Sequence, residues 1–310
     1  MDITVVIGTY NRASSLRLTL QSLQAIEVPT SLKWEILIVD NNSTDSTRSV
    51  VEEFALTSVL TVRYVFESQQ GRSFALNRGI SEAKGEIIVF TDDDVTFDPQ
   101  WLISLKQALD QWNCIAVGGR IVPVWNDPMP SWLQMEGQQA IGHFDVGDQP
   151  VEIEYAHGAN GAFKRKAFEK YGLFKTGVSV DGKLLAGYED DEFGHRLTSN
   201  GERIMYAPDA IVYHPVESRK LNKAYFRKWF YDTGRTAVRA RIWPRETILY
   251  FGIPRYFFRA LIENSIRWPI TLDEKCRFRR ECHVWRAAGG ILEGWRMFWR
   301  KEGPELPHRN

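Results

Sequence analysis

Short apolar runs alternate with amphipathic segments along the first third of the chain. Four runs are rich in β-branched residues, which is typical of buried strands: ITVVIGTY (residues 3–10), WEILIVDNN (34–42), LTVRYVFE (60–67) and EIIVF (86–90). Three segments between them carry helical signals: ASSLRLTLQSLQA (13–25), STDSTRSVVEEFA (43–55) and GRSFALNRGISEAKG (71–85). This alternation predicts an α/β fold with βαβ units and a mainly parallel sheet that helices cover on both faces.

The pattern is less regular after residue 121. Residues 122–132 (VPVWNDPMPSW) hold three prolines, so we expect an irregular segment or a lid there. Four later segments carry clearer patterns: a strand, a Gly-rich turn and a helix over 152–172, a loop over 178–190, a helix over 189–201, and a pair of strands over 203–216.

From Lys220 onward the chain is predicted to be helical, basic and aromatic, with breaks at Pro244, Pro254 and Pro269. The net charge of zero is a cancellation: residues 1–217 carry 18 Lys and Arg against 30 Asp and Glu, and residues 218–310 carry 21 against 9. We therefore predict a domain of residues 1–217 followed by a helical extension of residues 218–310.

The composition of this extension indicates an anionic partner. Arg and Lys interleaved with Trp, Phe and Tyr are typical of helices at an anionic membrane surface. Helices that pack on the preceding domain and expose arginines are the alternative. We expect no nucleic acid, because no nucleic-acid-binding motif accompanies the basic residues.

Nothing in the sequence predicts a membrane span or a secretion signal. No stretch approaches the 18 or so uncharged apolar residues of a spanning helix, and the start MDITVVIGTYNR does not have the pattern of a signal peptide. The three cysteines show no C-x-x-C spacing and are expected to be reduced thiols. We therefore expect a cytoplasmic protein, with any membrane contact peripheral on the cytoplasmic face of the inner membrane.

Polar residues follow three of the predicted strands at the point where each one ends. Thr9, Tyr10 and Asn11 end the first, Asp40 ends the second, and Asp92 to Asp94 end the fourth. Ligands of open α/β sheets bind outside the carboxyl ends of the strands. Asp92 and Asp94 would share one side of an extended chain, and two such carboxylates suit a divalent cation. A solvated acidic turn is the alternative for a short D-x-D motif. The glycine signatures of P-loop and Rossmann dinucleotide sites are absent.

Four acids compete for a chemical role in the helix that begins at Glu189. Acids in a first helical turn also suit the helix dipole, which is the structural alternative for all four. Glu192 lies four residues before Arg196, so an ordinary ion pair explains it. Asp190 lies three residues before Phe193, which places it above the apolar stripe of the helix and facing inward.

Four of these segments together resemble the family 2 glycosyltransferases of the GT-A fold. They are VVIGTYNRASSLRLTLQSL, ILIVDNNSTDST, GRSFALNRGISEAKGEIIVFTDDDV and GYEDDEFGHRL, and the resemblance covers about residues 1–217. It implies a nucleotide-sugar donor, a UDP-sugar by family frequency, together with a Mn2+ or Mg2+ ion and direct displacement with inversion at the anomeric carbon. It also implies a hydroxyl acceptor on a glycan or a polyprenyl-linked lipid.

The resemblance assigns the donor and metal residues by position. Thr9, Tyr10 and Asn11 would line the base and ribose pocket, and Asp40 would accept a hydrogen bond from the base. Asp94 would be the direct metal ligand, Asp92 would reach the ribose or a metal-bound water, and Asp93 would fill the variable middle position. Family members often carry Ala-Arg-Asn where this chain has Ala75-Leu76-Asn77, so Arg72 is the candidate that replaces the arginine on the donor phosphates.

The resemblance also bears on the base and on a late histidine. It places the general base at Asp190, with Glu189 as an orienting or acceptor-binding neighbour and Asp191 as the second candidate. His214 would be a third metal ligand, with a purely structural histidine as the alternative.

Several further residues have both a functional and a structural interpretation. His157, Asn160 and Gly161 lie in a Gly-rich turn, which either approaches the substrates or is a plain tight turn. Trp125 and Trp132 either pack in a core or stack on a sugar.

Two other functions compete with an inverting transferase. A sugar nucleotidyltransferase would need a Gly-rich, lysine-bearing signature near the start, and GTYNRASS has neither. A non-catalytic module that binds a nucleotide-sugar or a membrane would commonly have lost its base, whereas this chain retains Asp190.

Overall fold

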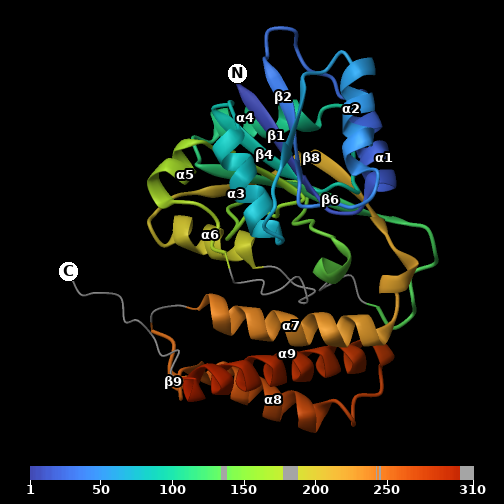
Figure 1. Cartoon of the computed structure of the whole chain (residues 1–310). Helices are drawn as coiled ribbons and strands as arrows, with labels where there is room; N and C mark the ends of the chain where they lie inside the picture. The colour runs from blue at the N-terminus through green and yellow to red at the C-terminus, as the bar shows by residue number, and fades with distance from the viewer. Residues whose placement is uncertain (134–137, 177–187, 242, 244–245, 301–310) are drawn as a thin grey trace. The chain divides into compact units, whose positions relative to one another are not determined.

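The computed structural model describes residues 1–133, 138–176, 188–241, 243 and 246–300 of the chain (Figure 1). Contacts within the chain divide it into two compact units. The first unit consists of Met1–Asn126, Ile141–Gly182 and Glu189–Val216, and the second of Asp127–Ala140, Lys183–Tyr188 and Glu217–Asn310. Most of the loop predicted over residues 178–190 lies outside the described residues, as does Pro244.

One eight-stranded sheet forms the centre of the first unit. Its strands are β1 (Ile3–Thr9), β2 (Trp34–Asp40), β3 (Val62–Phe66), β4 (Ile87–Thr91), β5 (Thr96–Phe97), β6 (Ala116–Trp125), β7 (Asn160–Lys164) and β8 (Ile204–Val216), in the order β3-β2-β1-β4-β7-β6-β8-β5. The four strands from β3 to β4 are parallel, and so are β6 and β8. Strand β7 runs antiparallel between β4 and β6, and β5 runs antiparallel to β8. The predicted α/β fold with a mainly parallel sheet is confirmed.

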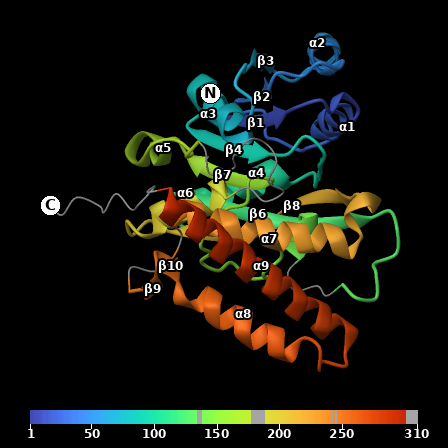
Figure 2. The same cartoon turned by 60° about the horizontal axis from the view of Figure 1, so that its bottom comes forward.

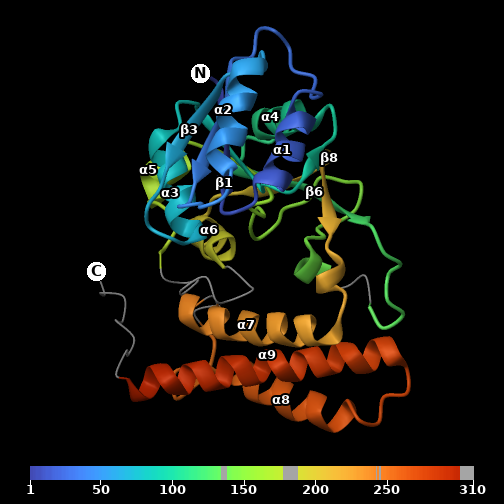
Figure 3. The same cartoon turned by 45° about the vertical axis from the view of Figure 1, so that its right-hand side comes forward.

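Helices cover both faces of this sheet, as the apolar strands predicted (Figure 3). They are α1 (Ala13–Leu23), α2 (Thr47–Thr57), α3 (Arg72–Glu82), α4 (Trp101–Gln111), α5 (Lys166–Tyr171) and α6 (Glu189–Thr198). Alternate residues of β1 enter two separate cores, because side chains alternate along a strand. Val5 packs with α1, α2 and α4, whereas Val6 packs with α3, α5 and α6.

The second half of the sheet differs from the prediction in three places. The pair of strands predicted over residues 203–216 is one strand, β8 (Ile204–Val216), with a register shift opposite Gly119 and Arg120. The strand predicted at the start of residues 152–172 is reduced to one bridge between Glu152 and Met205, and the strand lies after the Gly-rich turn, as β7.

The third difference is that β6 continues through Pro123 into the segment predicted to be irregular. A proline is tolerated in a strand only where its missing N–H needs no ladder partner. Strand β7 pairs with β6 only along Ala116–Gly118. At Pro123, the edge of β6 that faces β7 therefore extends past the end of this pairing.

Helices dominate the second unit, as the sequence predicted. They are α7 (Lys223–Ala240), α8 (Arg255–Arg267) and α9 (Glu274–Trp299), together with the short strands β9 (Leu249–Tyr250) and β10 (Ile253–Pro254); 3-10 turns occur at η1 (Gln138–Ile141) and η3 (Ser218–Lys220). Trp132 packs on Phe226 and Phe278, which explains why residues around 132 belong to this unit. Among the described helices, none is long and apolar enough to span a membrane.

Helices α7 and α9 lie side by side and approach unusually closely (Figure 1). A Cβ atom on Gly234 would lie 1.9 Å from the carbonyl oxygen of Arg286, and one on Gly289 would lie 2.1 Å from that of Tyr231. Both neighbours are backbone atoms, which cannot move unless the helices separate. The glycines therefore set the distance between the two helices.

We predict that Gly289→Ala destabilises the protein by about 1–3 kcal/mol, because the new methyl group overpacks the helix contact. In a helix without this contact, the same change would stabilise by about 1 kcal/mol through helix propensity. Thermal denaturation followed by circular dichroism measures the effect. The control Ala288→Gly, at the next position of α9, should lose only about 1 kcal/mol from propensity. A higher melting temperature for Gly289→Ala would contradict the close packing.

Candidate active site

The parallel strands bring three sets of polar residues to one edge of the sheet. Thr9 at the end of β1 pairs in register with Asp40 at the end of β2. Ile7 of β1 pairs with Thr91, so Asp92 to Asp94 leave β4 at the same edge. The edge predicted from the strand ends is therefore the one where the candidate side chains gather.

Asp92, Asp94 and His214 form a cluster that fits a metal ion. Each residue offers one ligand atom, and these atoms all lie within 4.8 Å of one another. The His214 Nδ1 atom lies 3.1 Å from the carbonyl oxygen of Pro215. If Nδ1–H donates to that oxygen, Nε2 keeps its lone pair, and this atom lies 3.6 Å from Asp94 Oδ1. Carboxylate oxygens with one imidazole suit Mn2+, and the carboxylates also suit Mg2+.

Arg12 binds the acidic triplet and was missed in the sequence. Its Nη1 atom lies 2.9 Å from Asp93 Oδ1 and 2.7 Å from Asp94 Oδ2. Burial raises the pKa of Asp93 to about 6, although the charge of Arg12 opposes this shift. Arg12 thus holds one oxygen of Asp94 and leaves the other facing His214. Its position directly after Asn11, at the end of the first strand, was the available signal.

Arg72 connects the acidic triplet with the candidate base. Its Nη1 atom lies 3.2 Å from Glu189 Oε1 and 3.3 Å from Asp190 Oδ1, and its Nη2 atom lies 3.6 Å from Asp92 Oδ1. Burial lowers the pKa of Arg72, but the three carboxylates outweigh burial and raise it above its ordinary value. Leu76, one helical turn further along α3, is buried in the core. Arg72 therefore lies at the strand edge, one turn before the position where the family often has arginine.

The first turn of α6 presents Asp190 beside Arg72. Phe193 and Leu197 are fully buried on the same helix, as the apolar stripe predicted. Asp190 keeps 18% of its side chain exposed, and its Oδ2 atom accepts a hydrogen bond of 2.8 Å from the Gly158 N–H. Glu192 pairs with Arg196, as expected.

Glu189, next to Asp190, is almost wholly buried. Its side chain is 1% exposed, and its Oε1 atom faces Arg72. Within the described part of the chain, its Oε2 atom has no hydrogen-bond partner. This carboxylate therefore has one oxygen that can accept a further donor.

Gly158 and His157 complete this part of the site, and the sequence did not assign Gly158 a role. A Cβ atom on Gly158 would lie 2.1 Å from Arg72 Nη2 and 2.9 Å from Asp190 Oδ2, so only glycine fits without displacing them. Burial lowers the pKa of His157 to about 4, and the charge of Arg72 adds to this. His157 is therefore neutral at pH 7 and contributes no positive charge beside Arg72.

The other residues predicted to bind the nucleotide-sugar donor lie at the same edge. Two of them, Asn11 and Asp40, accept hydrogen bonds from within the protein. Asn11 has a φ of 50°, and its side-chain oxygen accepts a hydrogen bond of 2.7 Å from the Thr44 N–H. Asp40 accepts hydrogen bonds from the Ser43 N–H and the Tyr64 hydroxyl. Their roles in donor binding, with those of Thr9 and the exposed Tyr10, stay predictions.

The remaining ambiguous residues have structural contacts. The fully buried side chain of Asn160 accepts a hydrogen bond from Trp101 and donates to the carbonyl oxygens of Arg120 and Ala210. Gly161 lies within β7, and Trp132 packs on aromatic rings. These contacts favour packing over sugar binding for Asn160 and Trp132.

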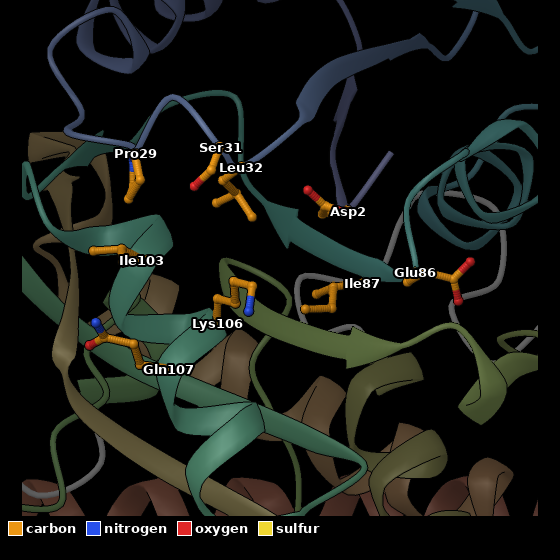
Figure 4. A pocket seen from close by; sticks show the side chains of 9 residues that line it. All are labelled: Asp2, Pro29, Ser31, Leu32, Glu86, Ile87, Ile103, Lys106 and Gln107. Atoms are coloured by element: carbon orange, nitrogen blue, oxygen red, sulfur yellow. The ribbon is translucent and has the colours of Figure 1, made fainter.

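A separate hollow of about 520 Å³ lies at the opposite end of the strands (Figure 4). Asp2, Glu86 and Ile87, which begin or precede β1 and β4, line it together with Lys106 of α4. Lys106 pairs with Asp110 on its own helix. The hollow is distinct from the carboxylate cluster and does not contribute to it.

Comparisons with known proteins agree with this geometry. The sequence profile of "Glycosyl transferase family 2" matches residues 4–172, which is more than half of the chain. The chain is 27% identical to the succinoglycan biosynthesis protein ExoM of Rhizobium meliloti over 241 residues, which are 76% of this chain and 74% of that protein. It is also 27% identical to the glucosyl-dolichyl phosphate glucuronosyltransferase of Haloferax volcanii over 221 residues, 69% of each chain.

Solved structures share the fold. The mannosyltransferase of Pyrobaculum calidifontis in complex with GDP-Man and Mn2+ has a TM-score of 0.63 at 18% identity, over 95% of this chain and 87% of that one. TarS 1–349 of S. aureus in complex with UDP-GlcNAc has a TM-score of 0.56 at 16% identity, over 98% and 93%. The profile match decides the family, and the relatives and the fold agree with it: the protein is a glycosyltransferase that belongs to glycosyl transferase family 2.

Proposed function

We propose that the protein is an inverting, metal-dependent transferase that moves a sugar from a UDP-sugar to a hydroxyl group. The observation that carries this proposal is the connected set of charged groups at the carboxyl edge of the sheet. Asp92, Asp94 and His214 offer a metal site, and Arg72 links Asp92 to the candidate base Asp190.

The donor would lie along the ends of β1, β2 and β4. Thr9, Tyr10, Asn11 and Asp40 are proposed to surround the base and ribose, with Asp93 supporting the triplet between its neighbours. A divalent Mn2+ or Mg2+ ion, held by Asp94, Asp92 and His214, would supply Lewis acidity to the diphosphate. Arg72 would bind the same phosphates with its planar guanidinium group. The Mn2+ and nucleotide-sugars in the solved structures of the same fold support this assignment.

The base must be an anion that accepts a proton, whereas the leaving diphosphate needs positive charge beside it. As the acceptor oxygen attacks the anomeric carbon, its proton passes to Asp190, and the bond from that carbon to the diphosphate oxygen breaks. One displacement of this kind inverts the anomeric configuration. The Gly158 N–H fixes one oxygen of Asp190, and buried Glu189 is positioned to orient the base or the acceptor. A carboxylate is a weak base in water, so position supplies much of its effect.

The acceptor is proposed to be a hydroxyl of a glycan or a polyprenyl-linked lipid. The relative from Haloferax volcanii is named for a glucosyl-dolichyl phosphate, and the relative from Rhizobium meliloti for succinoglycan biosynthesis. We further propose that residues 1–217 bind the donor and catalyse transfer, whereas residues 218–310 form the extension that contacts the acceptor or a membrane.

The metal site is tested by Asp94→Asn, which replaces an anionic ligand with a neutral amide. We expect Mn2+ to bind at least tenfold more weakly, as measured by calorimetric titration of the full chain in saturating UDP. Asp110→Asn, on the exposed face of α4, is the control and should leave Mn2+ binding unchanged. Equal Mn2+ affinity in wild type and Asp94→Asn would exclude Asp94 as a ligand.

The base is tested by Asp190→Asn, measured as UDP release from a panel of UDP-sugars with Mn2+, with and without EDTA. We expect turnover to fall by about 10²–10⁴-fold, because the amide cannot accept the proton. UDP affinity, measured by calorimetry, should stay within about threefold. Asp191→Asn is the matched control on the same helical turn and should retain turnover. If Asp191→Asn loses activity and Asp190→Asn keeps it, the base is assigned to the wrong residue.

Gly158→Ala tests the arrangement of Arg72 and Asp190 together. The new methyl group meets only the ends of two flexible side chains, so we expect turnover to fall at least tenfold with little change in the melting temperature. Gly147→Ala is no suitable control because its φ is 103°, so the exposed Ser265→Ala is used instead. Wild-type turnover in Gly158→Ala would show that the geometry around Arg72 does not limit the reaction.

A further inference from the structure

The C-terminal half of α8 and the turn that joins it to α9 carry a group of strongly exposed aliphatic side chains. Figure 2 shows this turn at one end of the hairpin that α8 and α9 form. Ile262, Ile266, Ile270 and Leu272 are 61%, 63%, 72% and 94% exposed. We call these four residues the hairpin tip. Single exposed apolar residues are common, but several large aliphatic ones gathered at one end of a helical hairpin indicate an interaction site.

The four tip residues do not belong to the hydrophobic core of the second unit. Helix α8 already buries its other face against α9, where Phe257 is 2% exposed and packs close to Gly290. Ile262 and Ile266 lie five and nine residues after Phe257, which places them on the opposite side of a helix with 3.6 residues per turn. The face of α8 that carries Ile262 and Ile266 therefore stays exposed in the folded unit.

Arg267 lies at the tip itself, next to Ile266, and two further arginines lie further back along α8. Arg255 and Arg259 occupy the same outer stripe of α8 as Ile262 and Ile266, because the spacings are three and four residues. At 1.5 Å per residue, Arg259 lies roughly 10 Å behind Ile266 along the helix. Residues 255–280 carry seven Lys and Arg against three Asp and Glu.

The three acidic residues of this region are engaged within the protein. Glu263 pairs with Arg259, Asp273 accepts a hydrogen bond from the Cys276 N–H, and Glu274 pairs with Lys223. Because Arg259 is itself the partner of Glu263, the basic character of the region comes from the surplus of Lys and Arg over Asp and Glu in residues 255–280.

We infer that the hairpin tip inserts into an anionic lipid bilayer. Apolar side chains at the tip would enter the acyl boundary, which peripheral segments reach to a depth of roughly 5–10 Å. Arginines set back by about that distance would meet the lipid phosphates. A second copy of the chain fits less well, because its own arginines would be brought against these. The inference uses no donor, metal or catalytic residue, so it stands apart from the proposed transferase mechanism.

Flotation with phospholipid vesicles tests this inference on the full chain. Without nucleotide, the wild type should float with vesicles of 70% phosphatidylcholine and 30% phosphatidylglycerol, and far less with phosphatidylcholine alone. The variant Ile266→Glu/Leu272→Glu should show at least a tenfold lower partition coefficient. The matched control is Leu56→Glu/Val59→Glu, which changes side chains that are 87% and 99% exposed in the first unit and should bind like the wild type. Both substituted pairs are exposed, so folding is expected to be preserved and is checked by circular dichroism.

Two further measurements separate the alternatives. Arg255→Gln/Arg259→Gln should lose the preference for phosphatidylglycerol while keeping the apolar tip. Sedimentation equilibrium should give the same mass for wild type and tip variant. The inference is overturned if the wild type does not float with anionic vesicles, if the control loses as much binding as the tip variant, or if the tip variant changes only self-association. UDP binding, measured in parallel, reports separately on the donor site.

Discussion

The active site depends on an excess of negative charge that two guanidinium groups only partly balance. Asp92 to Asp94, Glu189 and Asp190 bring five carboxylates together, and the ion pairs of the site set Arg12 and Arg72 against them. Carboxylates about 4 Å apart repel by roughly 4 kcal/mol at the effective dielectric of a protein surface. Such a group folds stably only with cations, and a divalent ion would supply the charge that the arginines leave unbalanced.

Arg12 and Arg72 balance the charge of different carboxylates. Arg12 contacts Asp93 and one oxygen of Asp94, so it supports the triplet from behind and leaves an oxygen facing His214. Arg72 contacts one carboxylate directly after β4 and two in α6, about a hundred residues further along the chain. A donor diphosphate that binds this guanidinium group would displace protein carboxylates from it. Asp190 would then lose its ion pair with Arg72 as the donor binds.

The sequence predicted the parts of this arrangement that local patterns encode. β-Branched runs located β1 to β4, and the strand ends located the aspartates, because both are decided within a few residues. Strand β7 was misplaced because its position depends on β4 and β6, whose pairing is long-range. Arg12 and Gly158 were missed for the same reason: each matters through a partner more than 30 residues away. The resemblance to a family supplied His214, which the pattern alone left structural.

The basic and aromatic composition of residues 218–310 does not by itself indicate which of their surfaces is free to bind a partner. The sequence gives α7 the basic and aromatic character of an interfacial helix, yet much of that character is used within the second unit. Arg227 pairs with buried Glu281, Arg235 and Arg239 pair with buried Glu293, and Phe226 packs against Trp132. A cation already held by a buried carboxylate gains little from a lipid phosphate. Among the described residues of this unit, the four most exposed aliphatic side chains lie instead on α8 and the turn after it. Only the packing of the helices reveals that this surface is left for a partner.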